Sequence, residues 1–193
     1  MRRSTAVFAV VLSSVALAQE ASREALLEWL TQTGTGTATA AIRGLEELDP
    51  AVRAQLAPTL AAWIMEFRDA AVERGVEEIP PEIREALAGF VPEEILDSVR
   101  WRIEQTVAAE GRSLLQVGAI RAVTLDHVIL FTTAAEAADA TLWAHEIFHV
   151  MQYRKWGVDE FARRYLADHA VIEHEAKEFR WQWMKASGRV PAP

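Results

Sequence analysis

The residues best suited to chemistry are His145, Glu146 and His149, which form the pattern HExxH. Two histidines four residues apart lie on one face of an α-helix, about one turn apart, so both imidazoles can reach a single metal ion. Glu146 projects beside that pair, where it can hold and deprotonate a metal-bound water. The surrounding apolar run, residues 142–151, contains neither proline nor glycine, which favours a buried helix. The pattern therefore predicts a zinc-dependent hydrolase that cleaves peptide bonds.

The alternative interpretation is a buried helix with two core histidines and no metal. That arrangement would leave two imidazoles and a carboxylate to be satisfied inside the protein.

A catalytic zinc ion usually has three protein ligands and one water, so the motif needs a further ligand. Lys155 stands six residues after His149, where the metzincin pattern has a histidine, and this excludes that class. A glutamate on a later helix is another common solution. Helix geometry does not choose between Glu173 and Glu175, which flank the apolar stripe of their helix on opposite sides. The downstream candidates are Asp159, Asp168, His169, Glu173, His174 and Glu175.

The start of the chain, residues 1–18, is predicted to be a signal peptide. Arg2 and Arg3 precede an apolar core and an A-x-A cleavage site before Gln19. We therefore expect export to the periplasm or outside the cell, with no membrane insertion after cleavage, because no later stretch approaches transmembrane length. The chain contains no cysteine, so neither a disulfide nor a lipid-anchor cysteine is expected.

The charge balance bears on the choice of partner. Without Arg2 and Arg3, 18 basic and 28 acidic side chains remain. This acidic balance argues against nucleic acid or an anionic membrane as a partner.

Residues 19–98 are predicted to form a helical N-terminal region without visible chemistry. Its clearest helix has apolar residues at three- and four-residue steps from Val52 to Phe67. Asp49 can cap this helix, Pro50 suits its first position, and Gly75 ends it. Shorter helices are expected over residues 21–32, 38–48 and 82–90, and after Pro92.

Residues 99–187 are predicted to form the metallopeptidase core, with residues 188–193 as a tail. Alternating apolar residues from Val99 predict a half-buried strand. The most convincing strand covers residues 122–131, and its exposed edge could pair with an extended substrate backbone. We expect an α+β, mostly helical fold with a small sheet. Further elements are expected at residues 114–117 (strand), 159–168 (helix, after the break at Gly157) and 170–186 (helix).

The segment from Trp143 to Tyr153, followed by residues 157–165 and the run Glu173-His-Glu-Ala176, resembles a known family. The family consists of small gluzincin-type HExxH metallopeptidases, best known as a domain of unknown function found with bacterial extracellular contractile injection systems. Its members have an AHELxHVxQ helix and a later ExEA helix. The similarity covers about residues 122–183.

This resemblance implies a zincin-like core in which zinc is bound by His145, His149 and Glu173, with Glu146 as the general base. The third ligand is Glu173 because it stands three residues before the alanine of the ExEA pattern. The chain departs from the pattern at Phe148, where threonine is common. It also departs at Lys177, where related gluzincins place an aspartate that orients a metal-binding histidine.

The predicted reaction is attack of a zinc-bound water on a peptide bond of a peptide or protein substrate, with Glu146 as proton acceptor. The developing oxyanion needs a further donor, and the available groups are Tyr153, Tyr165, His127 and His169.

Two alternatives remain open. In the first, a non-catalytic module is braced by zinc and binds a protein partner; a fourth ligand such as His169 would favour it. In the second, a latent peptidase is covered by residues 19–98. The sequence predicts neither the substrate nor the oligomeric state.

Overall fold

The computed structural model describes residues 50–104, 108–109, 112–113 and 121–189. The expected signal peptide, the helices expected before residue 49 and the strand expected at residues 114–117 lie outside these residues. Within the described part the fold is mostly helical α+β with a small sheet, which confirms the predicted class. No helix in this part is both long and apolar enough to cross a membrane.

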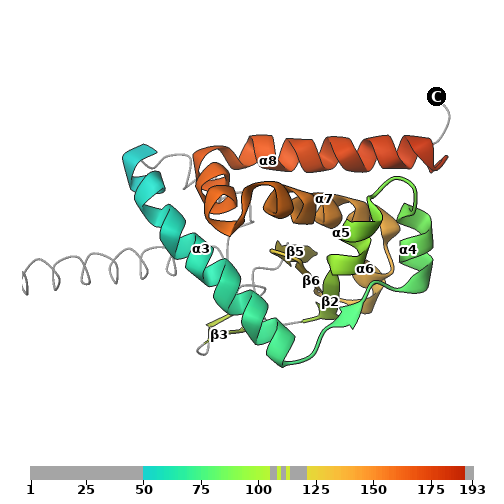
Figure 1. The fold of residues 1–193 in the computed structure, drawn as a ribbon, viewed down its shortest axis with the longest axis horizontal. Coiled ribbons are helices and arrows are strands. Elements are labelled where there is room, and N and C mark those ends of the chain that lie inside the picture. Colours follow the sequence, from blue (N-terminus) through green and yellow to red (C-terminus); the bar gives the residue numbers. More distant parts are fainter. Residues whose placement is uncertain (1–49, 105–107, 110–111, 114–120, 190–193) are drawn as a thin grey trace, which may run out of the picture.

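Along the described part of the chain, one long helix comes first, short helices and strands follow, and two long helices come last (Figure 1). The helices are α3 (Pro50–Glu73), α4 (Pro81–Leu87), α5 (Glu93–Ser98), α6 (Ala134–Ala137), α7 (Ala140–Trp156) and α8 (Val158–Ala186). The strands are β1 (Glu77–Glu78), β2 (Arg100–Ile103), β3 (Ala108–Ala109), β4 (Arg112–Ser113), β5 (Ala122–Leu125) and β6 (Val128–Phe131).

The main sheet has four strands in the order β1-β2-β6-β5, and β3 and β4 form a separate two-stranded sheet. β6 pairs in parallel with β2 and antiparallel with β5. All four side chains of β6 are buried. Val128 and Leu130 face a core formed with α3 and the start of α8, whereas Ile129 and Phe131 face a core formed with α4, α5 and α7. A central strand that is buried on both faces explains the uninterrupted apolar run in this segment.

The single strand predicted over residues 122–131 is wrong, because the segment is a hairpin. Asp126 and His127 form its two-residue turn, in which Asp126 has φ 57°. Aspartate tolerates the left-handed region better than most residues, so no glycine is needed there. The strand directly before α7 is therefore internal to the sheet. Among the described residues the edge strands of this sheet are β1 and β5, and β5 is the one that contacts α7.

The N-terminal helices pack against the rest of the protein. α3 ends at Glu73, close to the predicted stop at Gly75, and its apolar residues join the core that contains the first part of α8. The prediction of a helix over residues 82–90 is too long, because Ala88 is already extended and Gly89 has φ 77°. Buried residues of α4 and α5 lie in one cluster with those of α7.

The ends of α7 are defined by local contacts. The side chain of Asp139 accepts a hydrogen bond from the backbone N–H of Thr141 at 2.9 Å. At the other end Gly157, with φ 77° and ψ 164°, donates its N–H to the carbonyl of Tyr153 at 2.7 Å. This conformation is almost restricted to glycine, and it turns the chain directly from α7 into α8.

α8 is broken at Asp168, whose φ of −157° and ψ of 82° are not helical. The two helices predicted over residues 159–168 and 170–186 are therefore the two parts of α8, and the predicted boundary is confirmed. Figure 1 shows that the long second part runs beside α7, on the side away from the sheet.

Gly157→Ala should lower the free energy of unfolding by about 1–3 kcal/mol, because alanine pays a steric penalty in this backbone conformation. An added Cβ would meet no atom within 4 Å, so the loss would report backbone strain alone. Urea denaturation measures it. Arg154→Ala, at an exposed position of α7, is the control and should change stability by less than about 0.5 kcal/mol. An unchanged urea midpoint for Gly157→Ala would contradict the role of this glycine.

Candidate metal centre

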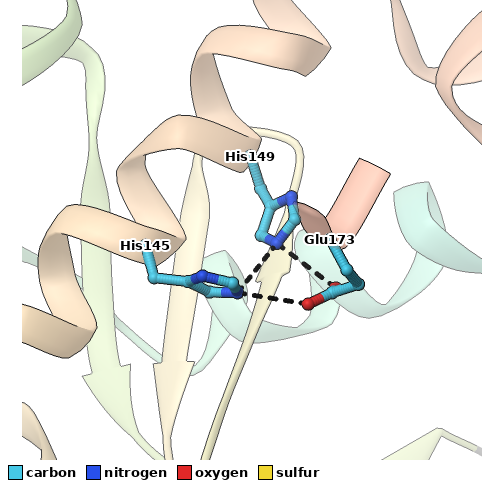
Figure 2. Close-up of side chains that lie close together, drawn as sticks. All are labelled: His145, His149 and Glu173. Atoms are coloured by element: carbon cyan, nitrogen blue, oxygen red, sulfur yellow. Dashed lines mark hydrogen bonds and ion pairs between the residues drawn. The ribbon is translucent and has the colours of Figure 1, made fainter. Parts of the chain in front are cut away.

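The structure brings together the three residues predicted as metal ligands (Figure 2). His145 and His149 project from one face of α7, and Glu173 approaches from the second part of α8. The two Nε2 atoms are 3.3 Å apart. One carboxylate oxygen of Glu173 lies 3.4 Å from Nε2 of His145, and the other lies 3.5 Å from Nε2 of His149.

With one ligand atom taken from each residue, the three atoms lie within 4.8 Å of one another, which is close enough for one metal ion to reach all three. Two imidazoles and one carboxylate are also a donor set that zinc accepts in hydrolytic sites. The group could therefore hold a metal ion, and the geometry does not identify which one.

The choice between the two glutamates of α8 is clear in the structure. Glu173 faces the histidines, with 26% of its side chain exposed. Glu175 instead accepts a hydrogen bond from Nε2 of Gln152 at 2.9 Å. Glu175 therefore lies behind the cluster, and Glu173 lies in it.

Gln152 links Glu175 to the cluster. Its side-chain oxygen lies 2.8 Å from Nδ1 of His149, and its Nε2 donates to Glu175 and, at 3.4 Å, to the carbonyl of Ile172. Because the amide nitrogen of Gln152 is committed as a donor, its oxygen accepts from Nδ1–H of His149. The lone pair on Nε2 of His149 is then directed toward Glu173 and His145.

This support was missed by the sequence analysis. The sequence analysis noted only that Lys177 stands where related gluzincins place an aspartate that orients a metal-binding histidine. Lys177 is exposed, and its Nζ lies 4.0 Å from a carboxylate oxygen of Glu173. Gln152 could have been found from its position, because it follows His149 by three residues on the same helix face. His145 has no residue that supports it as Gln152 supports His149. Its Nδ1 is buried without a hydrogen-bond partner among the described residues.

The charges of the cluster favour an ionised Glu173. Burial raises the pKa of this carboxyl, but the contacts with His145 and His149 outweigh burial and hold its pKa well below the usual range. Burial lowers the pKa of His149, and its contact with Glu173, together with the negative charges of Glu146 and Glu173, leaves that pKa raised. The negative charge that raises the pKa of His149 is also the charge that a bound cation would neutralise.

Glu146 is buried, with 5% of its surface exposed, and a residue of the sheet holds its carboxylate in place. The hydroxyl of Thr124 on β5 donates to Oε2 of Glu146 at 2.7 Å. This contact leaves the other carboxylate oxygen free to accept a proton. The charge of Glu146 is close enough to the cluster to raise the pKa of His149.

The four oxyanion-donor candidates lie in different surroundings. Tyr153 is buried, and its hydroxyl contacts the carbonyl of Thr124 at 3.3 Å. His127 contacts Asp126 in the β5–β6 turn, where Nδ1 and the carboxylate are 2.9 Å apart. His169 packs against the ring of Tyr165.

Among the four candidates, Tyr165 is the one whose pKa responds to the charges of both Glu173 and Glu146. Burial, followed by the charges of Glu173 and Glu146, raises the pKa of its phenol well above the usual range. Its ring stacks on Phe161, and the ring of Phe161 meets His149 edge-on at 6.3 Å. Tyr165 therefore stays protonated and able to donate beside the cluster.

Comparison with protein families gives one match in this region. Residues 78–157 match the model of the eCIS core domain, which links this segment to extracellular contractile injection systems. The matched segment contains His145, Glu146 and His149 but ends before Glu173. Comparisons with curated proteins and with solved structures give no match.

Gln152→Met should weaken zinc binding by about 10- to 100-fold, because His149 would lose the acceptor that fixes its orientation. Competition with a chromophoric chelator measures the affinity. Glu178→Gln is the control, since Glu178 lies on α8 and contacts Gln182 rather than the cluster. Equal zinc affinities for Gln152→Met and the unmodified protein would show that Gln152 does not support the site.

Proposed function

We propose that the protein is an exported zinc-dependent peptidase, with His145, His149 and Glu173 as metal ligands and Glu146 as the general base. The observation that carries this proposal is the joint placement of three ligand atoms within 4.8 Å of one another, with the buried carboxylate of Glu146 close enough for its charge to act on His149. A bound zinc ion would polarise the scissile carbonyl and lower the pKa of the attacking water.

Glu146 is placed to manage the proton of this reaction. Thr124 holds one of its carboxylate oxygens, which limits rotation of the side chain. The second oxygen would take a proton from the attacking water and pass it to the leaving amine. β5 carries Thr124 and is one of the two edge strands of the described sheet, so a substrate lying along β5 would pass beside Glu146.

The number of ligands favours an open, catalytic site over a closed structural one. A structural zinc site has four protein ligands, whereas a catalytic site keeps one position for water. Among the described residues the cluster has three members, and His169 is not one of them. This supports the peptidase over the zinc-braced binding module.

The match to the eCIS core domain supports a protein partner. We propose that such a partner belongs to a contractile injection system. The acidic charge of the chain, with 28 acidic against 20 basic side chains, is compatible with that proposal and argues against nucleic acid.

Glu146→Gln should abolish peptide hydrolysis while zinc content stays at the unmodified level, because the amide cannot accept the proton and is not a ligand. Cleavage of a fluorogenic peptide library and metal analysis of the same preparations measure the two quantities. His149→Ala is the matched variant and should lose the metal. Persisting turnover by Glu146→Gln, or absence of zinc from the unmodified protein after reconstitution, would refute the proposal.

Tyr165→Phe should lower kcat about 100-fold, with little change in zinc content, if the phenol donates to the oxyanion. The substitution keeps the ring that stacks on Phe161, so packing is preserved. Tyr153→Phe is the control, since the hydroxyl of Tyr153 is directed to a backbone carbonyl. A kcat for Tyr165→Phe within twofold of the unmodified value would exclude this role.

A further inference from the structure

The break in α8 lies between two parts of the helix with different roles. The first part, up to Ala167, packs on α3, and the second part carries Glu173. Non-helical angles at Asp168 leave the last carbonyls of the first part without the N–H donors that a continuous helix would supply. Such groups take their hydrogen bonds from side chains or from water.

Arg53 of α3 provides these hydrogen bonds. Its Nη1 donates to the carbonyl of Ala167 at 2.9 Å and lies 3.4 Å from the carbonyl of Leu166. On the other side of the break, the carboxylate of Asp168 accepts a hydrogen bond from the N–H of Val171 at 3.2 Å and so caps the second part. Hydrogen bonds therefore stabilise the break on both sides. One donor, Arg53, is more than 110 residues from the break in the sequence.

The direction of the second part decides where Glu173 lies. Glu173 follows the break by five residues, or about 7.5 Å of helix. A change of about 20° in helix direction would move a residue at that distance by about 2.5 Å. Metal–ligand distances tolerate only about 0.2 Å, so the contacts of Glu173 with the two histidines depend on the angle at Asp168.

We propose that Arg53 is a positioning residue for the third metal ligand. By holding the carbonyls at the break of α8, it sets the direction of the second part and with it the approach of Glu173 to His145 and His149. The inference rests on the metal centre of the proposed function. It gives a role to α3, a helix that lies outside the segment matching the eCIS core domain.

The test measures Co²⁺ binding to the full chain, by titration and by the visible absorption of the bound ion. Arg53→Met removes the donors and keeps the aliphatic stem, and it should weaken Co²⁺ binding at least tenfold and shift the absorption bands. Arg53→Lys, which can still donate to a carbonyl, should restore most of the affinity. Arg68→Met is the matched control: Arg68 is also on α3, but it pairs with Asp126 at the β5–β6 turn.

A double-variant cycle separates positioning from general destabilisation. If Arg53 acts through Glu173, then Arg53→Met should weaken Co²⁺ binding no further in a protein that already carries Glu173→Gln. An equal loss in both backgrounds would overturn the proposal. So would a Co²⁺ affinity of Arg53→Met within twofold of the unmodified value.

Hydrogen exchange of the metal-free proteins keeps this inference distinct from the proposed function. Arg53→Met, but not Arg68→Met, should speed amide exchange in residues 166–175 about tenfold. If the unmodified protein binds no Co²⁺ or Zn²⁺, the proposed function fails, and exchange then decides the role of Arg53 at the break. Unchanged exchange in residues 166–175 would overturn that role as well.

Discussion

The contact of the Glu173 carboxylate with the two imidazoles of α7 is the interaction on which the arrangement of the other elements depends. It places a negative charge and two histidines at the interface of two helices, where unpaired polar groups are costly. His145, Glu146, His149 and Gln152 are all buried on α7, so they cannot turn to solvent. Apart from the contact of Gln152 with His149, their partners come from other elements, namely α8 for the histidines and β5 for Glu146.

The three long helices and the sheet can be understood as the framework for that interface. β6 is buried on both faces, and one of these faces packs in the same core as α7. Gly157 turns the chain so that α8 follows α7 without a loop, and the break at Asp168 then sends the second part of α8 back along α7. α3 packs against the first part of α8, and its Arg53 donates a hydrogen bond to the carbonyl of Ala167 at the break. Residues 50–73 are therefore part of the same packed unit as the candidate site.

Local features of the sequence were sufficient to predict much of this. HExxH on an apolar helix predicted which face of α7 carries the histidines, and the three- and four-residue spacing of apolar residues predicted α3. The hairpin was missed because its turn uses Asp126 with φ 57° and contains no glycine to mark it. Helix periodicity could not separate Glu173 from Glu175, since the choice depends on the angle between two helices. The family resemblance indicated Glu173, the residue that the structure places against the histidines.

The contacts that periodicity cannot predict share one physical property, which is that they join segments far apart in the chain. Thr124 meets Glu146 across 22 residues, Gln152 meets Glu175 across 23, and Arg53 meets the break in α8 across more than 110. Each involves a polar side chain with no periodic pattern around it. The segment that matches the eCIS core domain contains Thr124, Glu146 and Gln152 but neither Glu175 nor Arg53. The third member of the cluster, Glu173, and its neighbour Glu175 come from α8, which lies outside the matched segment.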